Sequence, residues 1–258
     1  MYQKLTPLKQ ADHGRLRLLP ITDYGFARGE LVAPIVIDEI ADVAREYPIV
    51  FPKGGRLPAA LMGVLKDSNA YVGMDGKWLA TYIPVHLRHY PLAITRVPAQ
   101  AAQGEGSAQK EGRLVVLIDE ASAVLSQSEG QPLFAEDGKL APASQQRMRL
   151  MEQMQGRAGI TQGLVKAIEA AGLLVERTIR IQRDGEADRR VTGIRVIDEA
   201  ALNKLGNAAF NTLRKSGALP MVYASLLSWA NFRQGPIGKS HPLPAAPVEL
   251  VDDMIRFN

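Results

Sequence analysis

Short apolar runs separated by turn residues make up most of the first half of the chain. Two of these runs are introduced by Tyr47-Pro48 and Tyr90-Pro91, and a proline pushes the residue before it into an extended conformation. The short length of the runs is typical of strands rather than helices. Strands are predicted at residues 48–51, 57–65, 70–74, 92–95 and 114–118.

Tight turns are expected to connect several of the strands. Asp75-Gly76 lies between apolar flanks, which is a strong hairpin signal, and the second strand of this hairpin is expected at 78–82. Residues 85–89 fit either a helical turn or an edge strand. A further hairpin is predicted around Asp184-Gly185, because the residues before this turn alternate between apolar and polar side chains.

The spacing of apolar residues becomes helical in the middle of the chain. Leucine, methionine, isoleucine and valine recur at helical spacing over 144–155 and 161–171. Ser144 and Thr161 are suitable N-caps, and Gly172 is a suitable end. We therefore predict two helices that form a hairpin. A later helix is predicted at 207–216, and residues 221–231 fit either a strand followed by a helix or one buried helix.

Together these elements predict an α+β fold, with helices packed on a mainly antiparallel sheet in a single compact domain. A mixed sheet stays open as an alternative. The domain is expected to span 1–235 and to carry an exposed glycine-rich loop at about 98–112. Residues 236–258 combine a proline-rich linker with apolar residues at near-helical spacing. We expect this last segment to dock on the chain itself or on a partner, including a second copy in a homo-oligomer.

Composition narrows the function classes. The chain has 258 residues and no cysteine, which excludes disulfides, thiolate metal sites and cysteine nucleophiles. Its net charge is only +4, and acidic residues interrupt the richest basic stretch, so we expect no nucleic-acid partner. The sequence has neither a signal-peptide pattern nor an apolar run of about 18 residues, which predicts a soluble, cytoplasmic protein without a membrane span.

Two histidines and two Asp-Glu pairs are the main candidates for chemistry. His86 and His89 would share one face of a helix, but no nearby carboxylate completes a metal motif, so we expect hydrogen-bonding roles and no metal site. Asp119-Glu120 and Asp198-Glu199 each follow an apolar run. Capping of a following helix accounts for each aspartate, whereas a function would use these carboxylates for acid–base work or a hard cation.

Arg88 is the best candidate to bind a carboxylate or phosphate, because aromatic residues and histidines surround it in the sequence. We therefore expect a recognition surface around Trp78, Tyr82 and Arg88. The structural alternative, which we favour, is a salt bridge from Arg88 to one of the Asp-Glu pairs. The sequence identifies no catalytic residue and no cofactor. The complete set of candidate ligand-binding residues is Trp78, Tyr82, His86, Arg88, His89, Asp119 and Glu120.

Several short motifs occur in a characteristic order along the chain. They are Tyr47-Pro48-Ile49-Val50-Phe51, Asn69-Ala70-Tyr71-Val72, Asp75-Gly76-Lys77-Trp78, Tyr82-Ile83-Pro84, Arg88-His89-Tyr90-Pro91, Ile118-Asp119-Glu120, Leu133-Phe134, Asp137-Gly138, Ile197-Asp198-Glu199 and Tyr223-Ala224-Ser225-Leu226 with Asn231. In this combination the chain resembles the bacterial SapC family over roughly residues 5–235. The glycine-rich insertion near Gln103 and the proline-rich tail depart from the family pattern.

The resemblance implies a soluble accessory protein of a family named after a surface-layer locus, and not the peptide-transporter permease of the same name. Our first hypothesis is therefore a non-catalytic protein that recognises a protein, a peptide or a small ligand, with a protein or peptide as the expected partner. The alternative is an enzyme that modifies an amino acid or a peptide, with or without a metal, in a pathway associated with halogenases and cupin-like proteins. Convergence of the histidines with Asp119 or Glu120 would favour the enzyme.

Overall fold

The computed structural model describes residues 1–97, 113–181 and 189–240. The chain divides into two compact units, each built from two parts of the sequence. Unit 1 contains Met1–Thr22 and Arg88–Gln153, and unit 2 contains Asp23–Leu87 and the described residues from Met154 onward. Both units combine helices with strands, and every strand pair among the described residues is antiparallel. The predicted α+β class is therefore confirmed, while the domain boundaries stay a prediction.

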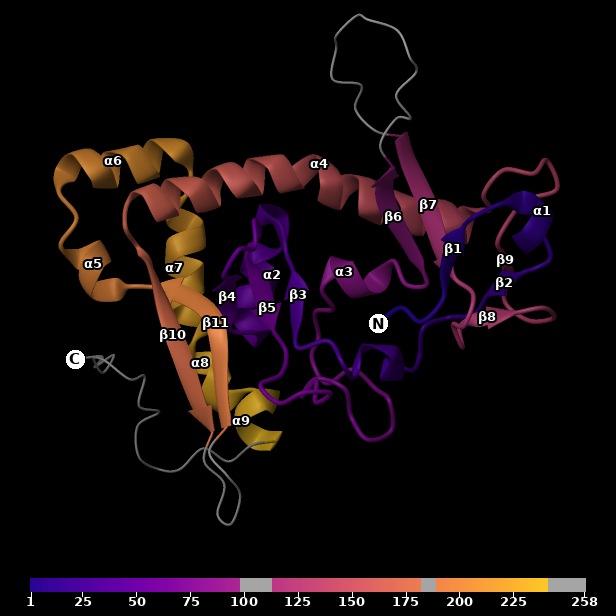
Figure 1. Cartoon of the computed structure of the whole chain (residues 1–258), viewed down its shortest axis with the longest axis horizontal. Coiled ribbons are helices and arrows are strands. Elements are labelled where there is room, and N and C mark those ends of the chain that lie inside the picture. The colour runs from indigo at the N-terminus through magenta and orange to yellow at the C-terminus, as the bar shows by residue number, and fades with distance from the viewer. Residues whose placement is uncertain (98–112, 182–188, 241–258) are drawn as a thin grey trace, which may run out of the picture. The chain divides into compact units, whose positions relative to one another are not determined.

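Unit 1 is built around two small antiparallel sheets with the orders β1-β7-β6 and β8-β2-β9 (Figure 1). Its elements are β1 (Leu5–Pro7), α1 (Gln10–His13), β2 (Arg17–Leu18), β6 (Leu92–Val97), β7 (Arg113–Asp119), β8 (Leu125–Ser126) and β9 (Gln131–Pro132). The core of the unit packs Leu18, Leu92, Ile118, Leu133 and Met151 together. Because both sheets contribute to this core, burial of their apolar side chains holds them in one unit.

Unit 2 is built on a sheet with the order β10-β11-β4-β5-β3 (Figure 1). Its elements are η1 (Gly25–Ala27), β3 (Val32–Pro34), η2 (Ile37–Glu39), α2 (Ile40–Glu46), β4 (Ile49–Pro52), β5 (Ala59–Leu61), β10 (Leu174–Ile181), β11 (Arg189–Ile197), α5 (Glu199–Asn203), α6 (Asn207–Ser216), α7 (Leu219–Ser228), α8 (Ala230–Gln234) and α9 (Pro236–Ser240). Ile49, Val50 and Phe51 are all buried, as expected for a central strand. Helix α7 packs against β4, β11 and α2.

The predicted helical hairpin is wrong, because α4 (Pro142–Ala170) is one continuous helix. Gly156 and Gly159 interrupt the apolar pattern, yet a glycine costs a helix only about 1 kcal/mol and no proline breaks the segment. The Thr161 hydroxyl donates to the Arg157 carbonyl oxygen at 2.8 Å instead of capping a new helix. Residues of α4 up to Gln153 belong to unit 1, and those from Met154 to unit 2.

Other local predictions had mixed outcomes. Strands form at β4, β5, β6 and β7, and α6 ends at Gly217, which adopts a left-handed φ of 79°. The prediction of strands at 70–74 and 78–82 is wrong, because this region contains only an isolated bridge between Val72 and Trp78. Residues 221–231 lie in α7 and α8, except for Trp229 between these two helices. The first residues of the predicted linker, 236–240, form the helix α9. The glycine-rich loop at 98–112, the Asp184-Gly185 turn and residues 241–258 lie outside the described residues.

Among the residues that the structure describes, no helix is both long and apolar enough to span a membrane. Although α4 has 29 residues, polar and charged side chains occur along its whole length.

Two polar side chains fasten α7 and α8 to the framework of unit 2. The Ser228 hydroxyl is fully buried and accepts a hydrogen bond from the Ile49 amide at 2.9 Å. The Asn231 amide group donates to the Ala44 carbonyl oxygen at 2.9 Å. Ser228 and the motif residue Asn231 therefore fix the helices against β4 and α2.

We expect Ser228→Ala to destabilise the protein by about 1–3 kcal/mol, because the buried Ile49 amide would lose its acceptor. Urea unfolding with Ser216→Ala as the control checks this, since Ser216 is exposed and its hydroxyl bonds only to Leu213 of its own helix. Equal unfolding midpoints for the two variants would contradict the role given to Ser228.

Candidate functional site

Residues 69–79, which we call the 69–79 loop, are held in unit 2 by their inward-facing side chains. The Asn69 side chain donates to the Ala27 carbonyl oxygen at 3.0 Å and accepts from the Tyr71 amide at 2.9 Å. The ring of Tyr71 stacks on Tyr47, with 4.3 Å between centroids, and lies 6.0 Å from the ring of Trp78. This aromatic packing turns Tyr71 and Trp78 inward and explains why the segment does not form the predicted hairpin strands.

The Tyr47 hydroxyl joins the two ends of this aromatic stack. It accepts a hydrogen bond from Trp78 Nε1 at 2.8 Å and donates one to the Tyr82 carbonyl oxygen. Burial raises the pKa of Tyr47 well above its ordinary value, so the phenol stays protonated and can act as this donor. The Tyr82 amide in turn donates to the Glu46 carboxylate at 3.0 Å. Trp78 and Tyr82 are thereby brought together.

Glu39 fixes the Tyr82 side chain from the other direction. Its carboxylate is almost completely buried and accepts from the Tyr82 hydroxyl at 3.0 Å and from the Val85 amide at 2.8 Å. It also accepts from the Val36 amide at 3.2 Å, in the manner of a capping-box glutamate. Glu39 is not among the residues predicted from the sequence, although its position in the first turn of a helix is a usable signal.

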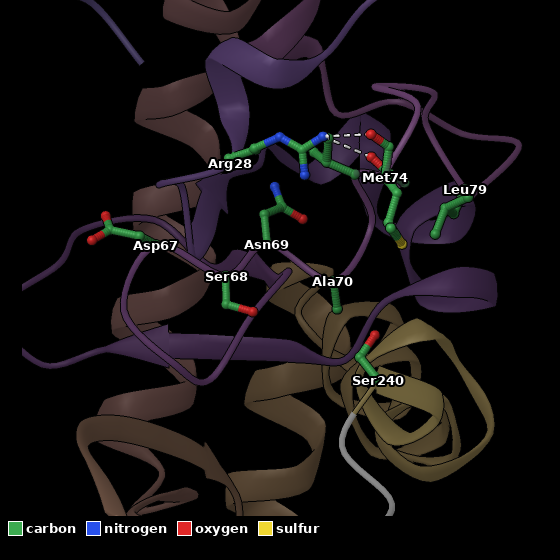
Figure 2. Close-up of a pocket in the computed structure, with 10 residues that line it drawn as sticks. Arg28, Asp67, Ser68, Asn69, Ala70, Met74, Leu79 and Ser240 are labelled. Carbon is green, nitrogen blue, oxygen red and sulfur yellow. Dashed lines mark hydrogen bonds between the residues drawn. The ribbon is translucent and has the colours of Figure 1, made fainter.

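The outward side of the 69–79 loop lines a pocket of about 280 Å³ (Figure 2). The pocket is formed by Arg28, residues 67–70 and 72–74, Leu79 and Ser240. Arg28 Nη2 donates to the carbonyl oxygens of Gly73 at 2.8 Å and Met74 at 3.3 Å, which holds the tip of the loop. The side chain of Met74 is 100% exposed and that of Leu79 is 55% exposed. Two apolar side chains are therefore exposed to solvent, on a loop whose backbone is held by hydrogen bonds.

Asp119 has a structural role in unit 1 that differs from the prediction. It does not cap a helix, because a turn follows β7 at this position. Its fully buried carboxylate accepts from the backbone amides of Gln3 at 3.1 Å and Lys4 at 2.8 Å, and from the Tyr90 hydroxyl at 3.3 Å. Asp119 therefore holds the N-terminal segment next to β7. The same prediction is confirmed for Asp198, which caps α5 through the Ala201 amide at 3.0 Å.

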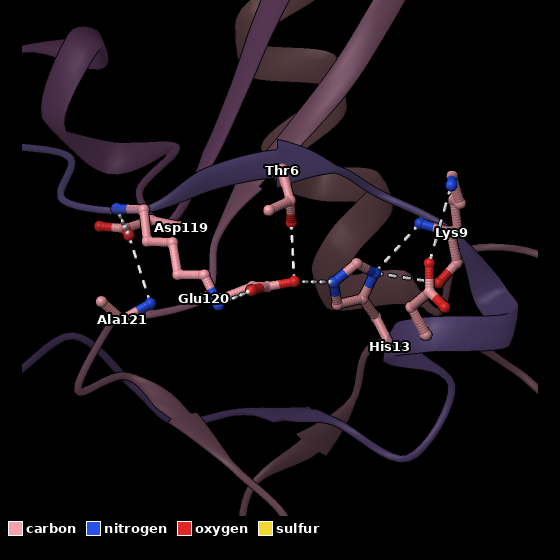
Figure 3. A network of polar contacts seen from close by, with 8 residues as sticks. Thr6, Lys9, His13, Asp119, Glu120 and Ala121 are labelled. Carbon is pink, nitrogen blue, oxygen red and sulfur yellow. Dashed lines mark hydrogen bonds and ion pairs between the residues drawn. The ribbon is translucent and has the colours of Figure 1, made fainter.

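Glu120 belongs to a neighbouring network in unit 1 (Figure 3). Its carboxylate accepts from Lys4 Nζ at 2.7 Å, Thr6 Oγ1 at 2.9 Å and His13 Nε2 at 3.1 Å. Hydrogen bonds from Lys4 and then His13 lower the pKa of Glu120 to about 2. His13 is itself buried, and sequence reasoning missed it because 107 residues separate the two partners.

His89 is buried in unit 1 with its imidazole turned toward backbone. Its Nδ1 lies 2.8 Å from the Leu92 carbonyl oxygen, which can only accept, so this nitrogen carries the proton. The Tyr2 hydroxyl lies 3.3 Å from the same nitrogen, and its ring packs on Tyr90, which bonds to Asp119. Burial lowers the pKa of His89, which favours the neutral imidazole at pH 7.

The seven candidate residues are divided between the units. Trp78, Tyr82 and His86 belong to unit 2, whereas Arg88, His89, Asp119 and Glu120 belong to unit 1. His86 and Arg88 are half-buried in α3 (Val85–Arg88), which forms the helical turn that was one of two alternatives. Within the described ranges, no group of three or more His, Cys, Asp or Glu side chains is placed to hold a metal ion.

Comparison of the sequence with models of protein families identifies the family of this chain. The model of the SapC family matches residues 8–234. The chain belongs to the SapC family. No curated protein and no solved structure gave a match. The SapC match includes residues of both units, and it contains Tyr47, Tyr71, Trp78 and Tyr82. In this SapC protein some of the motif residues that carried the resemblance, among them Tyr47, Asn69, Tyr71 and Trp78, build the framework behind the 69–79 loop.

The low pKa of Glu120 predicts a pH-dependent contribution to stability. Because the folded-state pKa is about 2, below the ordinary value of 4.5, the contribution is present above about pH 4.5 and is lost as the pH falls toward 2. We expect wild type to melt at a higher temperature than Glu120→Gln at pH 5.5, and this difference to disappear near pH 2. Glu129→Gln, at an exposed position, serves as the control. A difference that stayed constant over this range would contradict the network.

Proposed function

We propose that this SapC-family protein is a non-catalytic binding protein that recognises a segment of a partner protein or peptide through the outer side of the 69–79 loop. The observation that carries the proposal is the exposure of Met74 and Leu79 beside a pocket, on a loop held from both sides. Isolated exposed apolar residues are common on proteins, but a pocket next to them gives a partner side chain a place to bind.

The fixed backbone of the loop supports binding. Inward contacts of Tyr71 and Trp78, together with the hydrogen bonds from Arg28, restrain the loop before any partner arrives. A surface that is already ordered loses less conformational entropy on association, so more of the contact energy appears as affinity. Met74 adds an adaptable side chain, because methionine is unbranched and polarisable and can fit partners of different shape.

In this proposal Trp78 and Tyr82 contribute indirectly. Their polar groups bond to Tyr47 and Glu39, so they hold the binding loop in place. The contacts with the partner are made by Met74, Leu79 and the wall of the pocket. The proposed recognition surface therefore differs from the one expected around Trp78, Tyr82 and Arg88, because it is formed by the outer side of the 69–79 loop and the pocket beside it.

The enzyme hypothesis has weaker support. It requires His86 or His89 to act together with Asp119 or Glu120. The hydrogen bonds and ion pairs of these two carboxylates are instead made with other groups. Asp119 holds the backbone amides of the N-terminal segment, and Glu120 bonds to His13 and Lys4. We therefore rank binding first.

Selection of peptides on the full-length protein tests the proposal. We expect the selected peptides to bind Met74→Gln/Leu79→Gln at least tenfold more weakly than wild type, because burial of each apolar side chain is worth about 1.5–3 kcal/mol. Isothermal titration calorimetry gives the dissociation constants. Ile160→Gln is the matched control, because Ile160 is also an apolar residue of unit 2 and is 52% exposed on α4. Failure to select any peptide, or equal weakening in both variants, would overturn the proposal.

A further inference from the structure

We infer that the pocket beside the 69–79 loop binds the C-terminal carboxylate of a peptide whose last side chain is apolar, and that Arg28 recognises this carboxylate. The inference rests on the proposed function and specifies the chemistry of its ligand. It combines three features of one pocket: a positioned guanidinium, an apolar wall and a small volume.

Arg28 is oriented for recognition by its contacts with the loop. A single guanidinium nitrogen, Nη2, makes both of its hydrogen bonds, to Gly73 and Met74. Nε and Nη1 make no hydrogen bond to the described residues, and Arg28 forms no ion pair with any of them. A guanidinium carries five N–H donors in a planar fork, and carboxylates bind such a fork through two parallel hydrogen bonds. The contacts of Nη2 therefore hold the guanidinium in place, while the N–H groups of Nε and Nη1 stay available to a carboxylate.

The other charge in the pocket favours a ligand with a single negative charge. Asp67 also lines the pocket, so its carboxylate balances the charge of Arg28. In Figure 2 the Asp67 carboxylate points away from the guanidinium. Close approach of a monoanion to Arg28 is thus permitted, whereas a phosphate dianion would meet stronger repulsion from Asp67.

The apolar side chains and the volume of the pocket indicate which side chain the last residue of the ligand carries. Val72, Met74 and Leu79 line the side formed by the loop, and Figure 2 shows the Met74 side chain running from the guanidinium toward Ser240. A volume of about 280 Å³ lies just below the usual range for small-molecule pockets. It suits one terminal residue, with its side chain on Met74 and Leu79 and its carboxylate on Arg28.

The test uses defined probes and the Met74 methyl group as the reporter. Protein labelled with ¹³C at its methionine methyl groups is titrated with acetyl-Ala-Leu, with acetyl-Ala-Leu-amide and with hexanoate. The Met74 signal is assigned by its loss in Met74→Leu. We expect acetyl-Ala-Leu to shift this signal with an affinity at least fivefold higher than that of the amide or of hexanoate.

Variants of Arg28 establish its part in this preference. Arg28→Gln should bind the acid and the amide equally, and Arg28→Lys, which keeps the charge without the fork, should keep only part of the preference. Arg56→Gln, at another exposed arginine of unit 2, should leave it unchanged. Because Arg28 also restrains the tip of the loop, the readout in each variant is the ratio of the affinities for acid and amide, which a general loosening of the loop would not change.

The outcomes separate this inference from the proposed function. Equal binding of acid and amide to wild type would overturn the role of the carboxylate, and equal binding of hexanoate would point to small acids rather than a peptide end. A Met74 signal that none of the probes shifts would also overturn the inference. In each case the proposed function stands or falls separately, on the effect of Met74→Gln/Leu79→Gln on the selected peptides.

Discussion

The hydrogen bonds of the Tyr47 hydroxyl are the interaction on which the site in unit 2 depends. Tyr47 precedes β4, the strand that pairs with both β5 and β11, so its position is fixed by the sheet. Its hydroxyl accepts from Trp78 Nε1 and donates to the Tyr82 carbonyl oxygen, which ties the end of the 69–79 loop and the segment after it to that strand. Because these groups are partly buried, loss of the hydroxyl would leave the indole donor and the carbonyl acceptor to compete for other partners, at a cost of about 1–3 kcal/mol.

Some side chains of the 69–79 loop pack inward and hold the loop, whereas others are exposed to solvent. Tyr71 and Trp78 pack on the aromatic stack, whereas Met74 and Leu79 face solvent at the pocket. The stack alone would leave the tip of the loop free to move, and Arg28 restrains it by donating to two consecutive carbonyl oxygens. The same arginine therefore orders the loop and offers its other donors to the pocket. In unit 1 a buried polar group also holds a segment without regular structure. There the Asp119 carboxylate accepts hydrogen bonds from the backbone amides of Gln3 and Lys4 and so fixes the N-terminal segment.

Local signals predicted local structure well. The apolar run at β4, the cap provided by Asp198 and the glycine that ends α6 all act within a few residues, and each was recognisable in the sequence. Errors arose where distant groups decide the conformation. Asp119 has the same sequence context as Asp198, but its carboxylate is used by the amides of Gln3 and Lys4, more than a hundred residues earlier. No local sequence pattern indicates the pairing of His13 with Glu120. The same is true of the position of Arg28 beside Met74, so the pocket could not be predicted from the sequence.

Native-state hydrogen exchange of Tyr47→Phe tests whether the Tyr47 hydroxyl holds the 69–79 loop, because this change removes the hydroxyl and keeps the ring that stacks on Tyr71. In the wild type the amides of Gly73 and Leu79 are bonded to the carbonyl oxygens of Lys77 and Tyr71, so their exchange reports opening of the loop. We expect both amides to exchange at least tenfold faster in the variant, which corresponds to about 1.4 kcal/mol, while the amides of β4 change less. Unchanged protection of Gly73 and Leu79, or an equal increase throughout unit 2, would contradict the claim that Tyr47 holds the loop in place.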